Sequence, residues 1–211
     1  MWECYNRLIK PNGAILIFGT EPFSSNLRLS NLVDYRYDWY WNKKRAANFL
    51  FMNKQPGKLV ETISVFYKKQ PIYNPQKIDN PNGVSSRHLY KNPSKISRNV
   101  KDLMGSESDR GLSKTDNVNF HGSNYEPGKL LPNNILTYAK PTKRTHPTEK
   151  PVELLEYLIK TYTNEGDLVL DTCAGSGSTC VAAKNLKRNF IGFELDKSYY
   201  EMAYNRINNA T

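Results

Sequence analysis

The sequence contains few cysteines, no long run of apolar residues and no secretion signal. Its three cysteines, Cys4, Cys173 and Cys180, are an odd and scattered set among 211 residues. Such a set suits a reducing compartment and matches the ligand spacing of no zinc site. No stretch of about 18 apolar residues occurs, so no membrane span is expected. The opening MWECYNRLIKPNG lacks the basic start and continuous apolar stretch of a signal peptide. We therefore expect a cytoplasmic protein without a bound metal.

Acidic residues are outnumbered by basic ones, 20 against 30, which gives a net charge of +10. Residues 1–70 and residues 71–150 each carry a net charge of +6, whereas residues 151–211 carry −2. A basic body suits a polyanionic partner, because lysine and arginine contact phosphates. The charge alone is also compatible with the alternative, a basic and soluble surface that binds no polyanion.

Alternating strand and helix patterns predict an α/β protein with a parallel, doubly wound sheet. The expected strands are 14–19, 37–41, 61–69, 168–171 and 190–195, and the expected helices are 3–9, 152–162, 178–186 and 197–208. Between them, residues 71–145 are rich in Asn, Ser, Gly, Lys and Pro and predict a loop-rich insertion. The predicted organisation is therefore three parts: 1–70, the insertion 71–145, and 146–211.

The stretch LVLDTCAGSGSTC places a glycine loop between a predicted strand and a predicted helix. A phosphate-binding P-loop requires a lysine after its last glycine, and none follows Gly177. A dinucleotide fingerprint requires a third glycine or alanine where Cys180 stands. A carboxylate at the strand end, Asp171, would also repel a pyrophosphate and attract a cation. S-adenosylmethionine has an ammonium and a sulfonium and no phosphate, so it suits this loop better.

A second acidic residue, Glu194, ends the next predicted strand, FIGFEL. A carboxylate at that position can accept hydrogen bonds from both ribose hydroxyls of a nucleoside cofactor. The glycines Gly175 and Gly177 have a simpler alternative, a tight turn that binds nothing. Asp196 precedes the last helix and is expected to be its N-cap.

The segment HPTEKPVELLEYLIKTYTNEGDLVLDTCAGSGST, followed by IGFELD, resembles the C-terminal half of the β-class DNA amino-methyltransferases. Residues 1–75 also resemble the middle section of that family. The resemblance implies a Rossmann-like methyltransferase fold that binds S-adenosylmethionine and acts on double-stranded DNA, with adenine N6 favoured over cytosine N4. It also implies that a loop-rich target-recognition insertion precedes the glycine loop. The cofactor-binding residues that it implies are Asp171, Ala174, Gly175, Gly177 and Ser178 at the methionine end, Glu194 at the ribose, and His146, Thr148 and Lys150 before the first helix, with Lys150 suited to the methionine carboxylate.

The catalytic motif of that family, Asp-Pro-Pro-Tyr or its Ser and Asn forms, does not occur in the sequence. No catalytic residue is therefore assigned. In the family the sheet order is 3-2-1-4-5-7-6, and the motif follows strand 4, which lies between the strands matching 168–171 and 14–19. We expect a methyltransferase that is incomplete at its N-terminus and inactive alone, with a separate N-terminal segment as one possible partner. A catalytically dead DNA- or cofactor-binding subunit and a nicotinamide-dependent oxidoreductase are the alternatives.

Aromatic and other apolar residues suggest three further contacts. The insertion is expected to face DNA, with Tyr73, Tyr90, Phe120 and Tyr125 among its contact residues. The run Trp39, Tyr40, Trp41 could stack a base, but a strand packed on the sheet is the favoured interpretation. Phe190 or Leu195 could contact an adenine ring, although apolar residues at such positions more often belong to a core.

Overall fold

The computed structural model describes residues 1–79, 129–142 and 145–210. They fall into two compact units, one formed by Met1–Gln76 with Asn133–Thr211 and the other by Lys77–Pro132. In the second unit, the short strands β4 (Ile78–Asp79) and β5 (Lys129–Leu130) pair antiparallel. Tyr90, Phe120 and Tyr125, expected in the insertion, lie outside the described residues.

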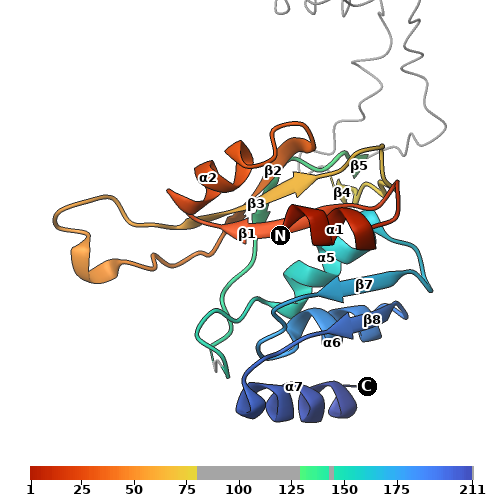
Figure 1. Ribbon diagram of the computed structural model, residues 1–211. Coiled ribbons are helices and arrows are strands. Elements are labelled where there is room, and N and C mark those ends of the chain that lie inside the picture. The colour runs from red at the N-terminus through yellow and green to blue at the C-terminus, as the bar shows by residue number, and fades with distance from the viewer. Residues whose placement is uncertain (80–128, 143–144, 211) are drawn as a thin grey trace, which may run out of the picture. The chain divides into compact units, whose positions relative to one another are not determined.

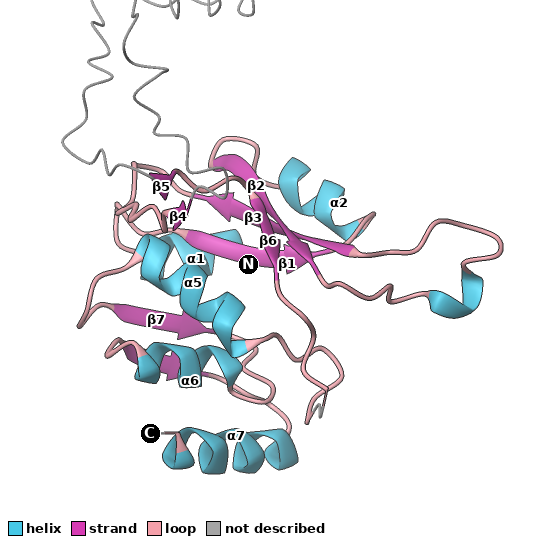
Figure 2. Ribbon diagram, turned by 180° about the vertical axis from the view of Figure 1, so that it is seen from behind, coloured by secondary structure: helices cyan, strands magenta, loops and turns pink. Residues whose placement is uncertain are grey.

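The first unit contains two sheets and the helices beside them (Figures 1 and 2). One sheet has four strands in the order β1-β3-β2-β6, and the other has two strands, β7 and β8. The strands are β1 (Ile15–Gly19), β2 (Tyr35–Asn42), β3 (Val60–Phe66), β6 (Ile135–Thr137), β7 (Leu168–Asp171) and β8 (Asn189–Gly192). The helices are α1 (Trp2–Leu8), α2 (Phe23–Leu29), the 3-10 turn η1 (Phe49–Phe51), α5 (Val152–Tyr162), α6 (Ser178–Asn185) and α7 (Lys197–Asn209). No described helix is long and apolar enough to cross a membrane.

The prediction of a parallel sheet is wrong for β3, which runs against the other three strands of its sheet. β3 pairs antiparallel with both β1 and β2. Among the strands that the structure describes, β2 pairs in parallel with β6 and β7 with β8. The connections explain the difference: a loop without a crossover helix joins β2 to β3, as antiparallel neighbours allow, whereas α6 crosses over between β7 and β8.

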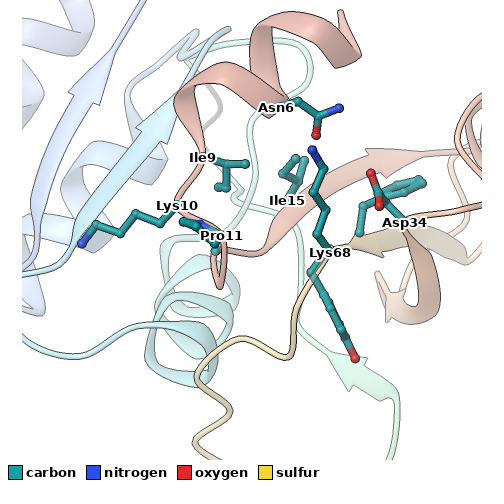
Figure 3. A pocket seen from close by; sticks show the side chains of 10 residues that line it. Asn6, Ile9, Lys10, Pro11, Ile15, Asp34 and Lys68 are labelled. Carbon is teal, nitrogen blue, oxygen red and sulfur yellow. The ribbon is translucent and has the colours of Figure 1, made fainter.

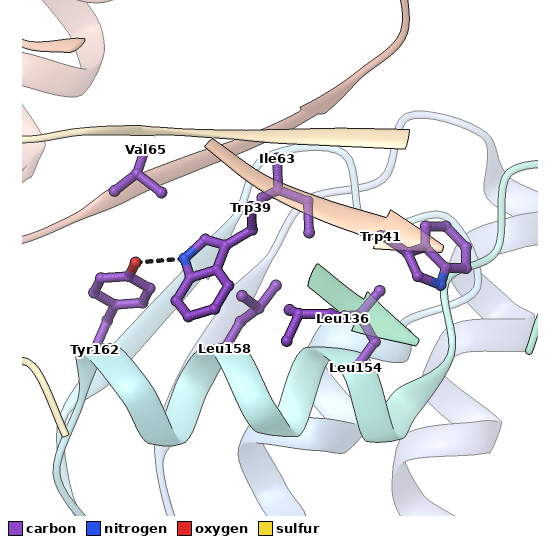
Figure 4. Close-up of a cluster of buried hydrophobic side chains, with 8 residues drawn as sticks. All are labelled: Trp39, Trp41, Ile63, Val65, Leu136, Leu154, Leu158 and Tyr162. Carbon is purple, nitrogen blue, oxygen red and sulfur yellow. Dashed lines mark hydrogen bonds between the residues drawn. The ribbon is translucent and has the colours of Figure 1, made fainter. Parts of the chain in front are cut away.

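The main apolar cluster lies between β2, β3 and α5 (Figure 4). Trp39 and Trp41, two positions apart on β2, lie on the same face and are 3% and 0% exposed. The Trp39 indole Nε1 donates a hydrogen bond of 2.7 Å to the Tyr162 hydroxyl, drawn as a dashed line in Figure 4. Tyr40, on the other face, is 38% exposed. The strand interpretation of this aromatic run is therefore confirmed for both tryptophans.

Helix α5 contributes to two apolar clusters through neighbouring faces. Leu154, Leu158 and Tyr162 recur every four residues and pack in the main cluster. Leu155 and Ile159 pack in a second cluster with two alanines of α6. One helix therefore joins the packing of the four-stranded sheet to that of the two-stranded sheet.

The outer face of β7 and β8 is open to solvent. Leu168 is 55% exposed, Leu170 38%, Ile191 44% and Phe193 59%. Among the described strands, β7 pairs only with β8, and β1 pairs only with β3. Each of β1 and β7 thus keeps one edge without a strand partner in the described part of the chain.

The second unit covers fewer residues than the predicted insertion 71–145. Both ends of that stretch belong to the first unit. Asn74 donates from its backbone N–H to the Thr161 carbonyl at 2.7 Å, and the Tyr73 ring packs edge to face on Tyr162. Strand β6 continues the main sheet beside β2. The apolar signal for β6 is only three residues long, which is why no strand was expected there.

Candidate functional site

The carboxyl ends of β7 and β8 lie side by side, with Asp171 at the end of β7 and Glu194 two residues after the end of β8. The parallel register pairs Asp171 with Gly192. Beyond it, the backbone N–H of Phe193 donates to the Asp171 carbonyl at 2.9 Å, and the N–H of Ala174 donates to the Phe193 carbonyl at 2.8 Å. The glycine loop therefore starts from a hydrogen-bonded pair of strand ends.

Two carboxylates hold this loop through backbone amides. Asp171 Oδ1 accepts from the backbone N–H of Cys173 at 3.0 Å. Glu194 Oε1 accepts from the N–H of Asp196 at 3.0 Å, and its Oε2 accepts from the N–H of Gly175 at 2.7 Å. These amides, that of Asp196 foremost, lower the pKa of the Glu194 carboxyl, because they stabilise its ionised form. Glu194 is therefore negatively charged at neutral pH.

The glycines of the loop take conformations that other residues rarely adopt. Gly175 has φ of +51° and Gly177 has φ of +72°. A Cβ at Gly177 would lie 3.0 Å from the Cβ of Ala203 on α7, so the loop also depends on close approach to that helix. Both glycines are buried, so the loop backbone is closely packed and leaves little room for side chains.

The HPTEKP segment reaches the glycine loop through His146. A Cβ at Gly175 would lie 3.4 Å from the imidazole ring, which also packs edge to face on Tyr199 with ring centroids 4.4 Å apart. The Thr148 hydroxyl lies 3.0 Å from His146 Nδ1. The structure therefore places His146 against the glycine loop, with Thr148 bonded to it, and their role in cofactor binding stays a prediction.

Lys150 lies elsewhere, over the carboxyl end of β1. Its ammonium pairs with Glu61 Oε1 at 2.8 Å, and it sits 5.1 Å from the ring centroid of Phe18 and 5.7 Å from that of Trp41. Its remaining described contact is a hydrogen bond to the carbonyl of Thr148. The structure therefore places Lys150 in an ion pair of the four-stranded sheet.

Ser178 points into a buried polar cluster beneath the glycine loop. The Arg206 guanidinium donates to the Ser178 hydroxyl at 3.1 Å and to the Ser176 hydroxyl at 3.2 Å. It also pairs with Glu149 Oε1 at 2.7 Å. The sequence predicts no role for Glu149 or Arg206. Nothing in the residue pattern of α7 distinguishes its arginine from other surface residues.

Glu149 is buried, yet it remains ionised. Burial alone would raise the pKa of its carboxyl, but hydrogen bonds from Thr145 and the positive charge of Arg206 outweigh burial and lower it. Glu149 Oε2 accepts from the backbone N–H of Thr145 at 2.8 Å. The ion pair thus ties the segment before α5 to α7, on either side of the glycine loop.

Three other predicted residues are also placed by the structure. Asp196 is the N-cap of α7, as predicted, and accepts from the backbone N–H groups of Ser198 and Tyr199. Phe190 packs in the second apolar cluster, which supports a core role. Leu195 is fully exposed beside Glu194 and remains available to a ligand.

The charges of the loop indicate which ligand it suits. Residues 171–180 contain one acidic and no basic residue, and Glu194 adds a second negative charge beside them. Such a site attracts a cation and repels a phosphate. The carboxylates of Asp171, at the end of β7, and Glu194, two residues after β8, therefore fit a ligand with a positively charged end and hydroxyl groups.

A separate hollow of about 160 Å³ lies at the opposite end of β1 (Figure 3). It is lined by Asn6, Ile9, Lys10, Pro11, Gly13, Ile15, Asp34, Phe66, Tyr67 and Lys68. Ile15 begins β1 and pairs with Phe66, the last residue of the antiparallel strand β3, so this hollow lies at the amino end of β1. In open α/β sheets ligands bind outside the carboxyl ends of the strands, so the glycine loop is the stronger candidate.

Comparison with known proteins gives a family match over almost the whole chain. The sequence profile N6_N4_Mtase, described as DNA methylase, matches residues 1–205. The type II methyltransferase M1.MboII of Moraxella bovis is 47% identical over 197 residues, which cover 91% of this chain and 71% of that protein. The type II methyltransferase M.HpaI of Haemophilus parainfluenzae is 28% identical over 204 residues, which cover 86% of this chain.

The chain matches less than two thirds of some of these relatives. It spans 61% of M.HpaI and 35% of the putative methylase YubD of Escherichia coli K12. Among solved structures, the M1.HpyAVI–SAM complex matches 97% of this chain and 78% of its own, with a TM-score of 0.60 and 25% identity. The fold is therefore that of the Rossmann-like DNA methyltransferases.

Proposed function

The chain belongs to the N6_N4_Mtase family of DNA methylases, and from that premise we propose that it binds S-adenosylmethionine for site-specific methylation of DNA. The proposed reaction transfers a methyl group to an exocyclic amine, adenine N6 being favoured over cytosine N4. The proposed site of action is the cytoplasm, where the DNA is. We also propose that the second unit, within the insertion 71–145, recognises the target sequence.

The arrangement of Asp171, Gly175 and Glu194 carries the proposal for the cofactor. Asp171 ends β7 and Glu194 follows β8 by two residues, and Glu194 accepts a hydrogen bond from Gly175, a buried glycine in the left-handed conformation. Glu194 uses one lone pair of each oxygen for backbone amides, which leaves acceptor capacity for ribose hydroxyls. Asp171 has a second oxygen for the ammonium of the methionine end. The donor set therefore fits S-adenosylmethionine and does not fit a pyrophosphate.

The other proposed cofactor residues act through the loop to different degrees. Ala174 and Gly177 shape its backbone, and His146 with Thr148 covers Gly175. Ser178 acts from below through Arg206. Lys150 could reach a methionine carboxylate only by leaving Glu61, so we propose that it mainly fixes the HPTEKP segment against the sheet.

When bound, the cofactor supplies an electrophilic methyl group on its sulfonium. The protein must then hold an extruded base with its amino group oriented toward that methyl. None of the described residues forms the Asp-Pro-Pro-Tyr type of acceptor that the family uses for this purpose. We therefore propose no catalytic residue in this chain.

The unpaired edges of β1 and β7 indicate how a base-holding segment would join. Each edge offers backbone groups that a further strand could pair with. The exposed apolar side chains on β7 and β8 would be covered by the elements that accompany this further strand. We propose that a segment carrying the acceptor motif, on the same polypeptide or a separate one, completes the sheet there.

Isothermal titration with S-adenosylmethionine tests the cofactor site. Asp171→Asn and Glu194→Gln should each weaken binding by about tenfold, about 1.4 kcal/mol, since each removes a charge that receives hydrogen bonds. Glu165→Gln, in the exposed turn before β7, is the matched control and should bind as the parent does. Unchanged affinity in both site variants, or preferential binding of NAD, would show that the site is misassigned.

An assay for transfer of labelled methyl groups into unmethylated plasmid DNA distinguishes two hypotheses. The chain is either part of an enzyme or a subunit that only binds. The 211-residue chain alone should transfer none. Addition of a segment with the Asp-Pro-Pro-Tyr motif should restore transfer. Turnover by the chain alone would place a catalytic acceptor among its own residues, whereas failure after addition would favour a binding-only subunit.

A further inference from the structure

The loop that joins β2 to β3, residues 43–59, projects an apolar tip into solvent. The tip is η1 with the residue after it. Its four side chains are all strongly exposed: Phe49 70%, Leu50 73%, Phe51 56% and Met52 54%. Four adjacent large apolar side chains in water are costly unless something covers them in use. Figure 1 shows the loop extending well beyond the sheet.

Hydrogen bonds hold the base of this tip in a defined shape. The Asn48 side chain spans the loop, because its Nδ2 donates to the Pro56 carbonyl at 3.1 Å and its Oδ1 accepts from the backbone N–H of Lys58. The N–H of Ala47 also donates to the Lys58 carbonyl at 3.1 Å. Inside the tip, the N–H of Lys54 donates to the Phe51 carbonyl at 2.9 Å. The apolar tip therefore has a defined conformation, held by hydrogen bonds across the base of the loop.

The charges around the tip have a single sign. Residues 43–59 include five basic residues and no acidic one. Lys43 is buried and pairs with Glu61. The other four, Lys44, Arg45, Lys54 and Lys58, are exposed, and none of their side chains forms an ion pair with a residue that the structure describes. An apolar tip flanked by free cations suits a polyanion that also offers an apolar interior.

The loop lies on the side of the first unit where the candidate site lies. Gly19, which ends β1, pairs with Thr62 near the start of β3, so the loop leaves the sheet at the carboxyl end of β1. In Figures 1 and 2 it projects toward the side to which β1 and β7 run. The glycine loop follows β7 at that same side.

We propose that the tip inserts between the base pairs of duplex DNA while the flanking cations contact its phosphates. This inference rests on DNA being the substrate, as proposed above. Phe, Leu and Met are side chains that wedge between base steps and kink the duplex. A second copy of the chain is the weaker candidate, because two such tips would bring eight exposed cations together. Base extrusion leaves a hole in the stack, which an apolar side chain could fill.

The experiment measures binding of the 211-residue chain to a 30-base-pair duplex of mixed sequence with dyes at both ends. The tip variant is Phe49→Ser with Leu50→Ser, and the charge variant is Arg45→Gln with Lys54→Gln. Leu8→Ser, 60% exposed at the end of α1, is the matched apolar control. Circular dichroism and sedimentation of each protein report folding and self-association.

We expect the tip variant to bind about tenfold more weakly and to abolish the change in energy transfer between the dyes that marks bending. The slope of log K against log salt should stay that of the parent. The charge variant should lower that slope by about 2, since each lost phosphate contact contributes roughly 0.9. The control should match the parent in all three measurements.

The outcomes separate this inference from the proposed function. If the parent chain binds no duplex DNA, DNA as the substrate fails and the inference fails with it. If the parent binds and bends DNA but the tip variant does so equally well, only the inference fails. If the parent sediments as a dimer and the tip variant as a monomer with the same DNA affinity, the tip is an interface between copies.

Discussion

The inner face of β2 and β3 and the outer face of β7 and β8 are equally apolar in sequence but differ in burial. Trp41, Ile63 and Val65 are fully buried beneath α5. Leu168 and Ile191 are about half exposed, because no described element covers them. An apolar run predicts a strand in both places. Whether that strand is buried depends on a second layer, which the first region has in its own chain and the second lacks among the described residues.

Trp41→Ala should destabilise the buried region more than any other change considered. The indole is fully buried, and it also faces the Lys150 ammonium. Its removal should lower the free energy of unfolding by about 3–5 kcal/mol, the usual cost of such a cavity. Tyr40→Ala, on the opposite face of the same strand, should cost less than about 1 kcal/mol. Urea titration followed by circular dichroism measures both, and equal losses would contradict the assigned faces.

Glu149→Gln should have a smaller effect and one that depends on pH. The variant leaves Arg206 without its charged partner, and we expect a loss of about 2 kcal/mol at pH 7, below the ~3–5 kcal/mol of a fully buried pair because Arg206 is partly exposed. The folded-state pKa of Glu149 lies below its ordinary value of 4.5. Its stabilisation is therefore complete above that value and is lost as the pH falls through the lowered pKa.

Unfolding titrations of the parent and of Glu149→Gln at several pH values test this expectation. The difference between their free energies should be constant near neutrality and shrink as the pH is lowered below about 4.5. A difference that stays constant down to pH 2 would mean that the stabilisation does not come from the ionised carboxylate.

Leu168→Ser should have the smallest effect and so sharpens the comparison of the two regions. The side chain is half exposed on the uncovered face of β7, and its loss should cost less than about 0.5 kcal/mol in the 211-residue chain. Val169→Ala, on the covered face toward α6, should cost about 1 kcal/mol. Thermal unfolding of both variants measures this order, and a reversed order would mean that the outer face is already covered.

Much of the fold and the candidate site follow from local sequence patterns. The strand end at Asp171 and the N-cap Asp196 each rest on a short motif, and the structure places them as predicted. The predicted strand 190–195 is wrong at its end, because β8 stops at Gly192 and Glu194 lies two residues beyond it. Ligand binding at these residues is still a proposal, because only their geometry has been observed.

Other features depend on contacts between distant residues, which local patterns do not encode. The antiparallel direction of β3 follows from the path of a loop, and the periodicity of its side chains is the same in either direction. The ion pair between Lys150 and Glu61 joins residues 89 positions apart, and that between Glu149 and Arg206 spans 57. Pairing of this kind is set by tertiary packing, so the sequence analysis missed both.

The two-sided packing of α5 ties the two sheets into one cooperative unit. Its residues at four-residue intervals hold one cluster, and the residues next to them hold the other. Opening either cluster removes packing from this helix, so the other cluster is destabilised at the same time. The amide protons of α5 should therefore be among the slowest in the first unit to exchange with heavy water, and their exchange should report the unfolding of both sheets at once.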